Sequence, residues 1–477
     1  MNVLLIQSDQ QRFDATGLNS GGLVQTPNLD RLAARGVNFL NPYCNSPLCC
    51  PSRASAATGM WPHEVGCYGN STPFDGRAPT YAHTLTEHGI AAASIGKLDF
   101  ASGCPHGFEA LDEHARRVGD PTELMRSPLT QRVGGYRRHC WDTELFDDDR
   151  DHGPVNEICQ WLRDRSGDPK PWHLFANFTL PHPPFKVPRH YYDRYDPESI
   201  PAPRVPEGPI DALHPAEKNH RYHWNCERLF DEDDVRYKRR IYFAMTTWLD
   251  AMVGRVLDTL EATGQAGRTL VIFTSDHGEN LGDHGMWSKG SFYDTAAKIP
   301  LIVAGPDLPS GAQVDTPVSW IDLAPTVLEA FGIEAPRHMH GHSILGLARG
   351  EAPDHPGMAL GEYHGHDAAT GQFMVRQGKF KYIYHVGMPA QLFDLEADPG
   401  EMHDLGESAE HTRLRSDLET LIRHSFDPEA LEPQVHAYQR ERLTAWIDAL
   451  GPDDAHARLR DMLGPQQYEV MKEYYGF

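Results

Sequence analysis

Short apolar runs that alternate with amphipathic helical patterns constrain the fold of this chain most strongly. The N-terminal run "NVLLIQSD" is continuously apolar before it ends in polar residues, as a buried parallel strand is. Alternation of this kind predicts a doubly wound α/β fold, with the active site outside the carboxyl ends of the strands. Similar strand runs cover 91–95, 174–178, 270–274 and 300–304, and helical patterns lie between them at 81–88, 155–163, 236–261 and 322–331.

The chain has 477 residues, enough for one large domain and a smaller second one. We expect a catalytic α/β domain over residues 1–350 and a C-terminal subdomain over residues 351–477, because the pattern changes between them. In the second part "KFKYIYH" alternates like an antiparallel strand, and "QLFDLEADPGE" is typical of a strand that runs into a turn. Helical patterns follow at 414–424 and 435–450.

The sequence is strongly acidic, with a formal net charge of -23 when its 27 histidines are neutral. This excess of acid argues against nucleic acid or an anionic membrane surface as the main partner, but it allows a small anionic substrate at a locally basic site. No apolar run approaches the roughly 18 residues of a membrane-spanning helix. The opening "MNVLLIQSDQ" lacks a basic n-region and a long apolar run, so the chain as given is predicted to be cytoplasmic.

Polar residues follow two of the predicted strands directly. Asp9 and Gln10 come after the first strand, and Asp276 and His277 come after the strand "TLVIFTS". Carboxylates that are distant in sequence but share one sheet edge suggest a site for a hard divalent cation, and the imidazole shifts the choice toward manganese or zinc. Each motif alone fits a helix N-cap equally well.

The segment "NSPLCCPSRASAATG", residues 45–59, places two adjacent cysteines before Pro-Ser-Arg and a run of small residues. It resembles the C-x-P-S-R signature of the type I sulfatase family, with Cys49 at the position of the nucleophile. The motifs "TPNLDRLAARGVNF", "ATGMWPH", "GKLDF", "LPHPPF" and "SDHGENLGDHG" stand in the order of that family. "SPLCCPSR" and "GKLDF" resemble the arylsulfatase K type of glucuronate-2-sulfatases, whereas "PTYAHTL", "HGFE" and "GEYHG" resemble choline sulfatase.

The resemblance implies an alkaline-phosphatase/sulfatase-like α/β fold: a large, mixed but mainly parallel sheet between helices, with a smaller C-terminal α+β subdomain. It also implies hydrolysis of a sulfate monoester, of a sugar or uronate, alkyl or aryl alcohol, through a covalent sulfo-enzyme intermediate. The nucleophile would be a formylglycine diol that a separate maturation enzyme makes from Cys49. A divalent metal is implied as well, and we favour Ca²⁺ with Mn²⁺ as the alternative.

Several residues take roles from the resemblance, motif by motif. Cys49 would touch a metal held by Asp9, Gln10, Asp276 and His277. Most sulfatases have Asp at the second of these positions and Asn at the fourth, so Gln10 and His277 depart from the pattern and resemble the phosphonate monoester hydrolase branch. By the same resemblance, Arg53 would brace the diol, and Lys97 would lie near both diol and sulfate. His182 and Lys289 would grip the sulfate and protonate the leaving oxygen.

Two further positions near the site are candidates for contact with the substrate or the diol. Asn70 lies in the loop after the nucleophile helix and is a candidate for substrate binding. Asp99 stands where most of the family has His, two residues after Lys97, so it could orient the diol, select the substrate, or serve only as an N-cap or salt-bridge partner.

Two stretches that lack periodicity, 119–153 and 200–234, are interpreted as insertions near the active-site rim. Locally basic and aromatic segments in and beside the second one are candidates for holding another anionic group of the substrate, such as a uronate carboxylate. A solvated surface is an equally good explanation of any one of these residues. The candidates are Lys186, Lys218, His220 and Arg221, with Trp224 as a ring that could stack on a sugar.

Two other functions remain open from the sequence. The first is a phosphonate monoester hydrolase or phosphodiesterase on the same scaffold, which Gln10 and His277 favour and Lys97 opposes. The second is a non-catalytic binding protein with a redox-sensitive cysteine pair. The C-terminal helices could also reach a neighbouring subunit, so a homo-oligomer is one expected partner besides the substrate and the maturation enzyme.

Overall fold

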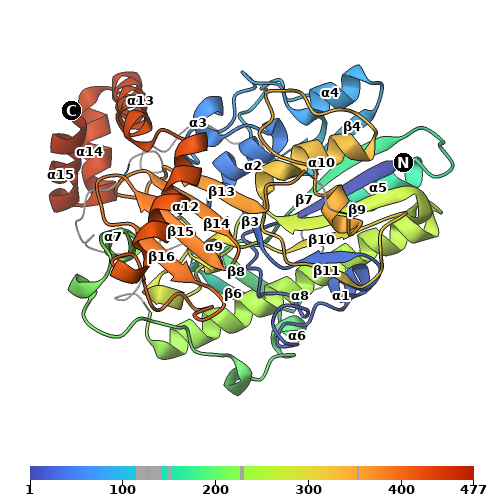
Figure 1. Cartoon of the computed structure of the whole chain (residues 1–477), viewed down its shortest axis with the longest axis horizontal. Helices are drawn as coiled ribbons and strands as arrows, with labels where there is room; N and C mark the ends of the chain where they lie inside the picture. Colours follow the sequence, from blue (N-terminus) through green and yellow to red (C-terminus); the bar gives the residue numbers. More distant parts are fainter. Residues whose placement is uncertain (114–125, 127–140, 148–152, 226–229, 352–353) are drawn as a thin grey trace.

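The computed structural model describes residues 1–113, 126, 141–147, 153–225, 230–351 and 354–477. Its centre is an eight-stranded sheet in the order β11-β2-β10-β9-β1-β7-β4-β5. These strands are β1 Asn2–Asp9, β2 Val37–Phe39, β4 Ala91–Gly96, β5 Glu109–Glu113, β7 Trp172–Pro181, β9 Thr269–Ser275, β10 Leu301–Ala304 and β11 Ala312–Val314. Figure 1 shows this sheet between two layers of helices.

Strand β1 lies at the middle of the sheet because it pairs in parallel with both β7 and β9. Strand β4 continues the parallel arrangement on β7, and β5 continues it on β4. Only β10 runs against its neighbours, antiparallel to β9 and to β2. The mainly parallel, mixed sheet that the sequence predicts is therefore confirmed.

Two helical layers cover the sheet, since successive side chains of a strand point to opposite faces. Leu4 and Ile6 of β1 face α1 (Pro27–Ala34), α5 (Val155–Asp164) and α8 (Glu232–Ala262), whereas Val3 and Leu5 face α2 (Cys49–Thr58), α4 (Tyr81–Glu87) and α10 (Leu323–Ala330). The long helix α8 runs along one side of the sheet in Figure 1, and α2 and α10 lie on the other.

The C-terminal part forms a second, antiparallel sheet of four strands in the order β13-β14-β15-β16. Its side chains Ala359, Met374 and Ile383 belong to the same hydrophobic core as α2 and α10. This sheet therefore packs directly on the helical layer that contains α2 and α10, called the catalytic layer below. The domain boundary near residue 350 stays a prediction. The elements are β13 Met358–Tyr363, β14 Gln372–Gln377, β15 Phe380–His385, β16 Gln391–Asp394 and α12 Thr412–Ser425.

Three further helices end the chain: α13 Pro428–Leu450, α14 Pro452–Leu463 and α15 Pro465–Tyr475. Figure 1 shows them gathered at the end of the molecule that lies away from the N-terminus. Their packing has its own small core, to which Leu443, Leu459 and Tyr468 contribute. Among the described residues, no helix has both the length and the apolar character needed to cross a membrane.

The structure describes only a few residues of the first predicted insertion but most of the second. Most of 119–153 lies outside the described residues. The described part of 200–234 contains helix α7 and the first turn of α8, although the sequence shows no periodicity over α7. The remaining short elements are β3 Pro42–Tyr43, β6 Thr143–Phe146, β8 Phe185–Pro188, β12 Val318–Ser319, α3 Pro62–Val65, α6 Arg189–Tyr192, α7 Pro215–Trp224, α9 Asp294–Ala297 and α11 Leu345–Ala348.

Candidate active site

The carboxyl ends of the central strands meet at one edge of the sheet, and the motif residues gather there. Asp9 is the last residue of β1, Asp276 follows β9, and Lys97 follows β4. Their side chains are buried or nearly so. The edge that strand topology marks as the site is therefore the edge that carries the predicted residues.

Helix α2 delivers Cys49 to this edge as its first residue. Leu48 precedes the helix and supplies no side-chain cap; instead Oδ1 of Asn70 accepts the backbone N–H of Cys50 at 3.1 Å. All ten residues of α2 are buried, and the small residues after Arg53 let the helix lie close behind the nucleophile position. A helix N-terminus here favours an anion bound beside residue 49. Asn70 is thus placed as the cap of this helix.

The thiol of Cys49 is surrounded by cationic groups. Its Sγ lies 3.2 Å from Nε2 of His277 and 3.9 Å from Nζ of Lys97. Burial alone would raise the pKa of Cys49, but Lys289, Lys97 and His277 hold this pKa well below its usual range. The pocket around residue 49 therefore stabilises negative charge.

Arg53 forms ion pairs with both carboxylates of the candidate metal site. Its Nε donates to Oδ2 of Asp276 at 2.8 Å and its Nη2 to Oδ2 of Asp9 at 3.1 Å. Its Nη1 donates to the carbonyl of Lys97 and, at 3.3 Å, to Oδ1 of Asn177. Burial would lower the pKa of Arg53, yet Asp276 and Asp9 raise it, so the guanidinium stays charged. Asn177 was not singled out from the sequence, although a polar residue in the apolar run 174–178 was a signal for it.

Four side chains offer ligand atoms that lie within 4.8 Å of one another: Asp9, Cys49, Asp276 and His277. Within the described part of the chain, Oδ1 of the buried Asp9 carboxylate receives no hydrogen bond, which a cation would remedy. Nδ1 of His277 lies 2.9 Å from the carbonyl oxygen of Gly278, an arrangement that directs Nε2 toward Cys49. The donor set fits a divalent metal.

The side chain of Gln10 forms two hydrogen bonds at the border of the candidate metal site. Its backbone adopts a φ of 64°, and its N–H donates to Oδ1 of Asp276 at 3.0 Å. Its side-chain oxygen accepts from Nζ of Lys289, and its side-chain nitrogen donates to Oε2 of Glu279. Gln10 thus links Lys289 to a buried carboxylate at the border of the metal site.

Glu279 belongs to the "SDHGE" motif but was not singled out from the sequence. Its Oε1 accepts the backbone N–H groups of Leu281 at 3.0 Å and Ser288 at 2.6 Å. These bonds close the turn that carries Lys289, the next residue after Ser288.

His182 follows β7 and is half-buried beside the nucleophile position. Its Nδ1 lies 2.5 Å from the carbonyl oxygen of Pro183, and its side chain also bonds Cys49. Burial and the positive charge of Lys289 lower the pKa of His182. A sulfate group bound nearby would counter this shift, because negative charge favours the imidazolium.

The candidate substrate-binding residues outside the centre differ in how closely they approach the Lys289 segment. Lys186 forms an exposed ion pair with Glu144 at 2.8 Å, and Lys218 forms one with Asp211 at 2.5 Å. His220 and Arg221 lie on α7. Nε2 of His220 is 3.0 Å from the carbonyl oxygen of Trp287, two residues before Lys289. Arg221 pairs with Glu217 at 3.6 Å and packs against Gly285. Of this group, His220 and Arg221 approach the Lys289 segment.

Asp367 is a buried carboxylate that sequence reasoning missed. It accepts the hydroxyl of Tyr363 and, at 3.1 Å, Nε1 of Trp224, and lies 3.3 Å from Nδ1 of His220. A side chain at Gly290 would meet Oδ2 of Asp367 at 2.3 Å. The carboxylate therefore joins the C-terminal sheet and α7 to the Lys289 segment. No local sequence pattern predicts such a contact.

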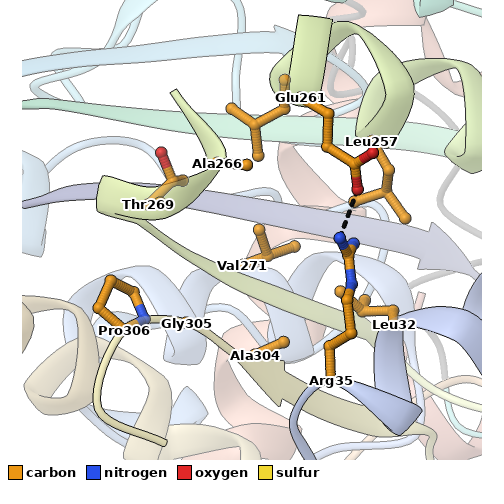
Figure 2. Close-up of a pocket in the computed structure, with 12 residues that line it drawn as sticks. Leu32, Arg35, Leu257, Glu261, Ala266, Thr269, Val271, Ala304, Gly305 and Pro306 are labelled. Carbon is orange, nitrogen blue, oxygen red and sulfur yellow. Dashed lines mark hydrogen bonds and ion pairs between the residues drawn. The ribbon is translucent and has the colours of Figure 1, made fainter. Parts of the chain in front are cut away.

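A separate hollow of about 330 Å³ lies at the opposite end of the sheet. It is lined by Thr269 and Val271 at the start of β9 and by Ala304 at the end of β10. Figure 2 shows these side chains and the ion pair of Arg35 with Glu261 across the hollow. Asp9, Cys49, Lys97 and Asp276 lie at the other edge, where the carboxyl ends of the strands meet.

A family model described as Sulfatase matches residues 1–333. The chain belongs to the sulfatase family. A second model, N-sulphoglucosamine sulphohydrolase, C-terminal, matches residues 282–426. Membership confirms the predicted family and makes the chain a sulfuric ester hydrolase.

Known relatives span nearly the whole sulfatase chain. Choline-sulfatase of Rhizobium meliloti (strain 1021) is 32% identical over 470 residues, which cover 94% of this chain and 90% of that protein. Arylsulfatase K of Xenopus laevis is 29% identical over 476 residues, which cover 94% and 87%. Both types of relative that the motifs indicated are thus confirmed.

Solved structures confirm the alkaline-phosphatase/sulfatase-like fold. The phosphonate monoester hydrolase of Agrobacterium radiobacter is 25% identical with a TM-score of 0.73, covering 89% of this chain and 96% of that one. A protein solved with its substrate D-glucosamine-2-N,6-O-disulfate is 22% identical with a TM-score of 0.71, covering 89% and 97%. The second likeness concerns the fold alone.

Proposed function

We propose that this sulfatase hydrolyses a sulfate monoester with formylglycine at residue 49 as its nucleophile and a divalent metal beside it. The observation that carries the proposal is the meeting of Cys49, three basic side chains and two carboxylates at one buried edge. Such a pocket neutralises the negative oxygens that shield sulfur in a sulfate ester.

The chemistry divides between the matured residue and its neighbours. Matured residue 49 would supply a geminal diol. One hydroxyl would attack sulfur as the S–O bond to the alcohol breaks, and deprotonation of the other would then expel sulfate and regenerate the aldehyde. Asp9, Gln10, Asp276 and His277 would hold the metal, which would supply positive charge that lowers the pKa of the diol and neutralises the sulfate. Ca²⁺ is our first choice and Mn²⁺ the second, because one imidazole joins three oxygen-bearing side chains.

The chain's own cations take the remaining roles. Arg53 fixes Asp9 and Asp276 through Nη2 and Nε, so the carboxylates keep their places. Lys97 lies 3.9 Å from the nucleophile sulfur and would face both diol and sulfate. We assign His182 and Lys289 to gripping the sulfate and giving a proton to the leaving oxygen.

For the substrate we propose a sulfate ester of a sugar or uronate, or of a small alkyl or aryl alcohol. The likenesses to arylsulfatase K and choline-sulfatase support this range. Asn70, Asp99, Lys186, Lys218, His220 and Arg221 stay candidates for contacts with the rest of the substrate. The maturation enzyme, a homo-oligomeric state and the cytoplasmic location stay predictions.

A second candidate is hydrolysis of phosphonate monoesters, favoured by Gln10 and His277 and by the likeness to the Agrobacterium radiobacter enzyme. Rates on a matched aryl sulfate and aryl phosphonate monoester separate the two. We expect the sulfate to turn over faster. Faster turnover of the phosphonate would replace the sulfatase proposal with this one.

The chemical state of residue 49 tests the proposed mechanism directly. A fragmentation mass spectrum of the tryptic peptide 36–53, from protein made in its native host, reports on Cys44, Cys49 and Cys50 separately. We expect an aldehyde at residue 49 alone. An intact thiol there in turnover-competent protein would refute the formylglycine mechanism, and intact thiols without turnover would support the binding-protein alternative.

A further inference from the structure

Lys97 is a nearly buried ammonium with two carboxylate neighbours. Its Nζ bonds Oδ2 of Asp9 on one side and lies 3.3 Å from Oδ2 of Asp99 on the other. The sulfur of Cys49 is 3.9 Å from the same nitrogen. The lysine therefore stands between a metal-site carboxylate and Asp99, facing the nucleophile.

Once a metal binds Oδ1 of Asp9, this one carboxylate faces three cations: the metal, Lys97 and Arg53. Its Oδ2 receives both Lys97 and, at 3.1 Å, Nη2 of Arg53. A dication on Asp9 would neutralise this carboxylate and repel the ammonium of Lys97. A buried ammonium without a counter-charge is costly, so Lys97 and the metal compete for Asp9 unless another acid holds the lysine.

Asp99 is built to be that other acid. It lies just beyond β4 in a left-handed backbone conformation with φ of 61°, which Asp tolerates better than most residues. Its side chain is 4% exposed, and the next residue, Phe100, is buried against Phe74. The carboxylate is thus fixed within 3.3 Å of the Lys97 ammonium.

We propose that Asp99 is a positioning residue that holds the Lys97 ammonium beside residue 49 and keeps it from competing with the metal for Asp9. This rests on the proposed function, because it concerns the same metal site. Asp99 then acts through Lys97 and makes no contact with the metal itself.

Calcium affinity of the unmatured protein, measured by titration calorimetry with CaCl₂ alone, tests the inference in a double-mutant cycle. Asp99→Asn should weaken Ca²⁺ binding about 10-fold, because Lys97 then turns wholly to Asp9. Lys97→Met should bind Ca²⁺ at least as well as the wild type. In the Lys97→Met background, Asp99→Asn should change the affinity less than about 2-fold.

Each other result has a defined meaning. An equal loss with and without Lys97 would show that Asp99 acts directly on the metal and would overturn the inference. Unchanged Ca²⁺ affinity in Asp99→Asn would overturn it too, while the sulfatase proposal stands. A wild type that binds neither Ca²⁺ nor Mn²⁺ would overturn the metal site of the proposed function and this inference together.

Thermal unfolding guards against a merely structural effect. In EDTA, Asp99→Asn should melt within a few degrees of the wild type, and only the rise on adding CaCl₂ should shrink. Asp258→Asn, which breaks the exposed ion pair of this α8 residue with Arg31 of α1, is the control and should keep the full rise. A rise in Asp99→Asn equal to that of the control would contradict the inference.

Discussion

At the scale of single residues, the two groups assigned to the leaving oxygen carry a sharp prediction. Lys289→Ala removes a buried cation near the nucleophile, and His182→Ala removes the half-buried imidazole that bonds Cys49. Each should lower kcat for an aryl sulfate by about 10²- to 10³-fold, the loss typical of a group that stabilises transition-state charge. Steady-state kinetics at saturating metal measures the effect.

A matched control separates chemistry from the mere loss of a lysine. Lys379 lies on the surface in an ion pair with Asp394, and Lys379→Ala should keep kcat within about 2-fold. A rate near normal in Lys289→Ala would show that the assignment of leaving-group chemistry is wrong.

Metal removal belongs to the same scale, because it depends on the ligand atoms of Asp9, Asp276 and His277. Exhaustive chelation should lower kcat at least about 100-fold, and adding CaCl₂ or MnCl₂ should restore it. At a free metal concentration of about 100 times Kd, metal binding would also raise the free energy of unfolding by about 2.7 kcal/mol. Full activity in protein shown to be metal-free by elemental analysis would exclude the site.

At the scale of elements, the cap of helix α2 can be tested apart from the nucleophile. Asn70→Ala removes the acceptor for the N–H of Cys50 and should lower the free energy of unfolding by about 1 kcal/mol. Asn70→Asp keeps an acceptor, so its stability should stay near that of the wild type. Its negative charge beside the anion site should raise KM for an aryl sulfate.

Urea unfolding and steady-state kinetics together decide this prediction. If Asn70→Asp and Asn70→Ala lose stability equally, Asn70 does not act as the cap. If KM is unchanged in Asn70→Asp, the N-terminus of α2 lies too far from the bound sulfate to matter.

The sequence predicts the elements of the core well, for a physical reason. Runs such as 174–178 and 270–274 are mostly apolar because both of their faces are buried, and β7 and β9 appear where they were expected. The direction of β10 against β9 has no such local signal, since an apolar run does not record which way its neighbour runs. Helix α7 was missed because its sequence "PAEKNHRYHW" has no apolar periodicity.

The candidate site follows the same division. Motif residues such as Asp9 and Asp276 could be predicted, because they stand at strand ends or inside a recognisable signature. Asn177 had a weak signal as a polar residue in an apolar strand, and Glu279 a weak one inside its motif. Asp367 had none, because its contacts with Tyr363 and Trp224 exist only after the C-terminal sheet has packed on the catalytic layer.

At the scale of the whole molecule, Glu362 shows how the two sheets are joined. It is a buried residue of β13, and its N–H donates to the carbonyl of Asn45, near the nucleophile, at 2.9 Å. Its carboxylate lies 2.9 Å from Nδ1 of His63 on α3 and 2.9 Å from Nε2 of His364. One buried residue therefore connects the C-terminal sheet to the segments that precede and follow the nucleophile helix.

This connection predicts a pH-dependent stability. Burial would raise the pKa of Glu362, but His63 and His364 lower it to about 2 from an ordinary value of 4.5. Because the folded-state pKa lies below the unfolded one, the contribution is present above pH 4.5 and is lost as pH falls toward 2. At about 1.4 kcal/mol per pKa unit it amounts to about 3 kcal/mol near neutral pH.

Glu362→Gln should therefore be less stable than the wild type by about 3 kcal/mol at pH 6, and less than half of this difference should remain at pH 3. The pKa of His63 is raised above its ordinary 6.5, so this partner stays charged throughout that range. Urea unfolding of both proteins at pH 3, 4, 5 and 6 measures the difference. A difference that does not change with pH would mean that the carboxylate stabilises the junction by packing and hydrogen bonds alone, and that its charge is not what joins the two sheets.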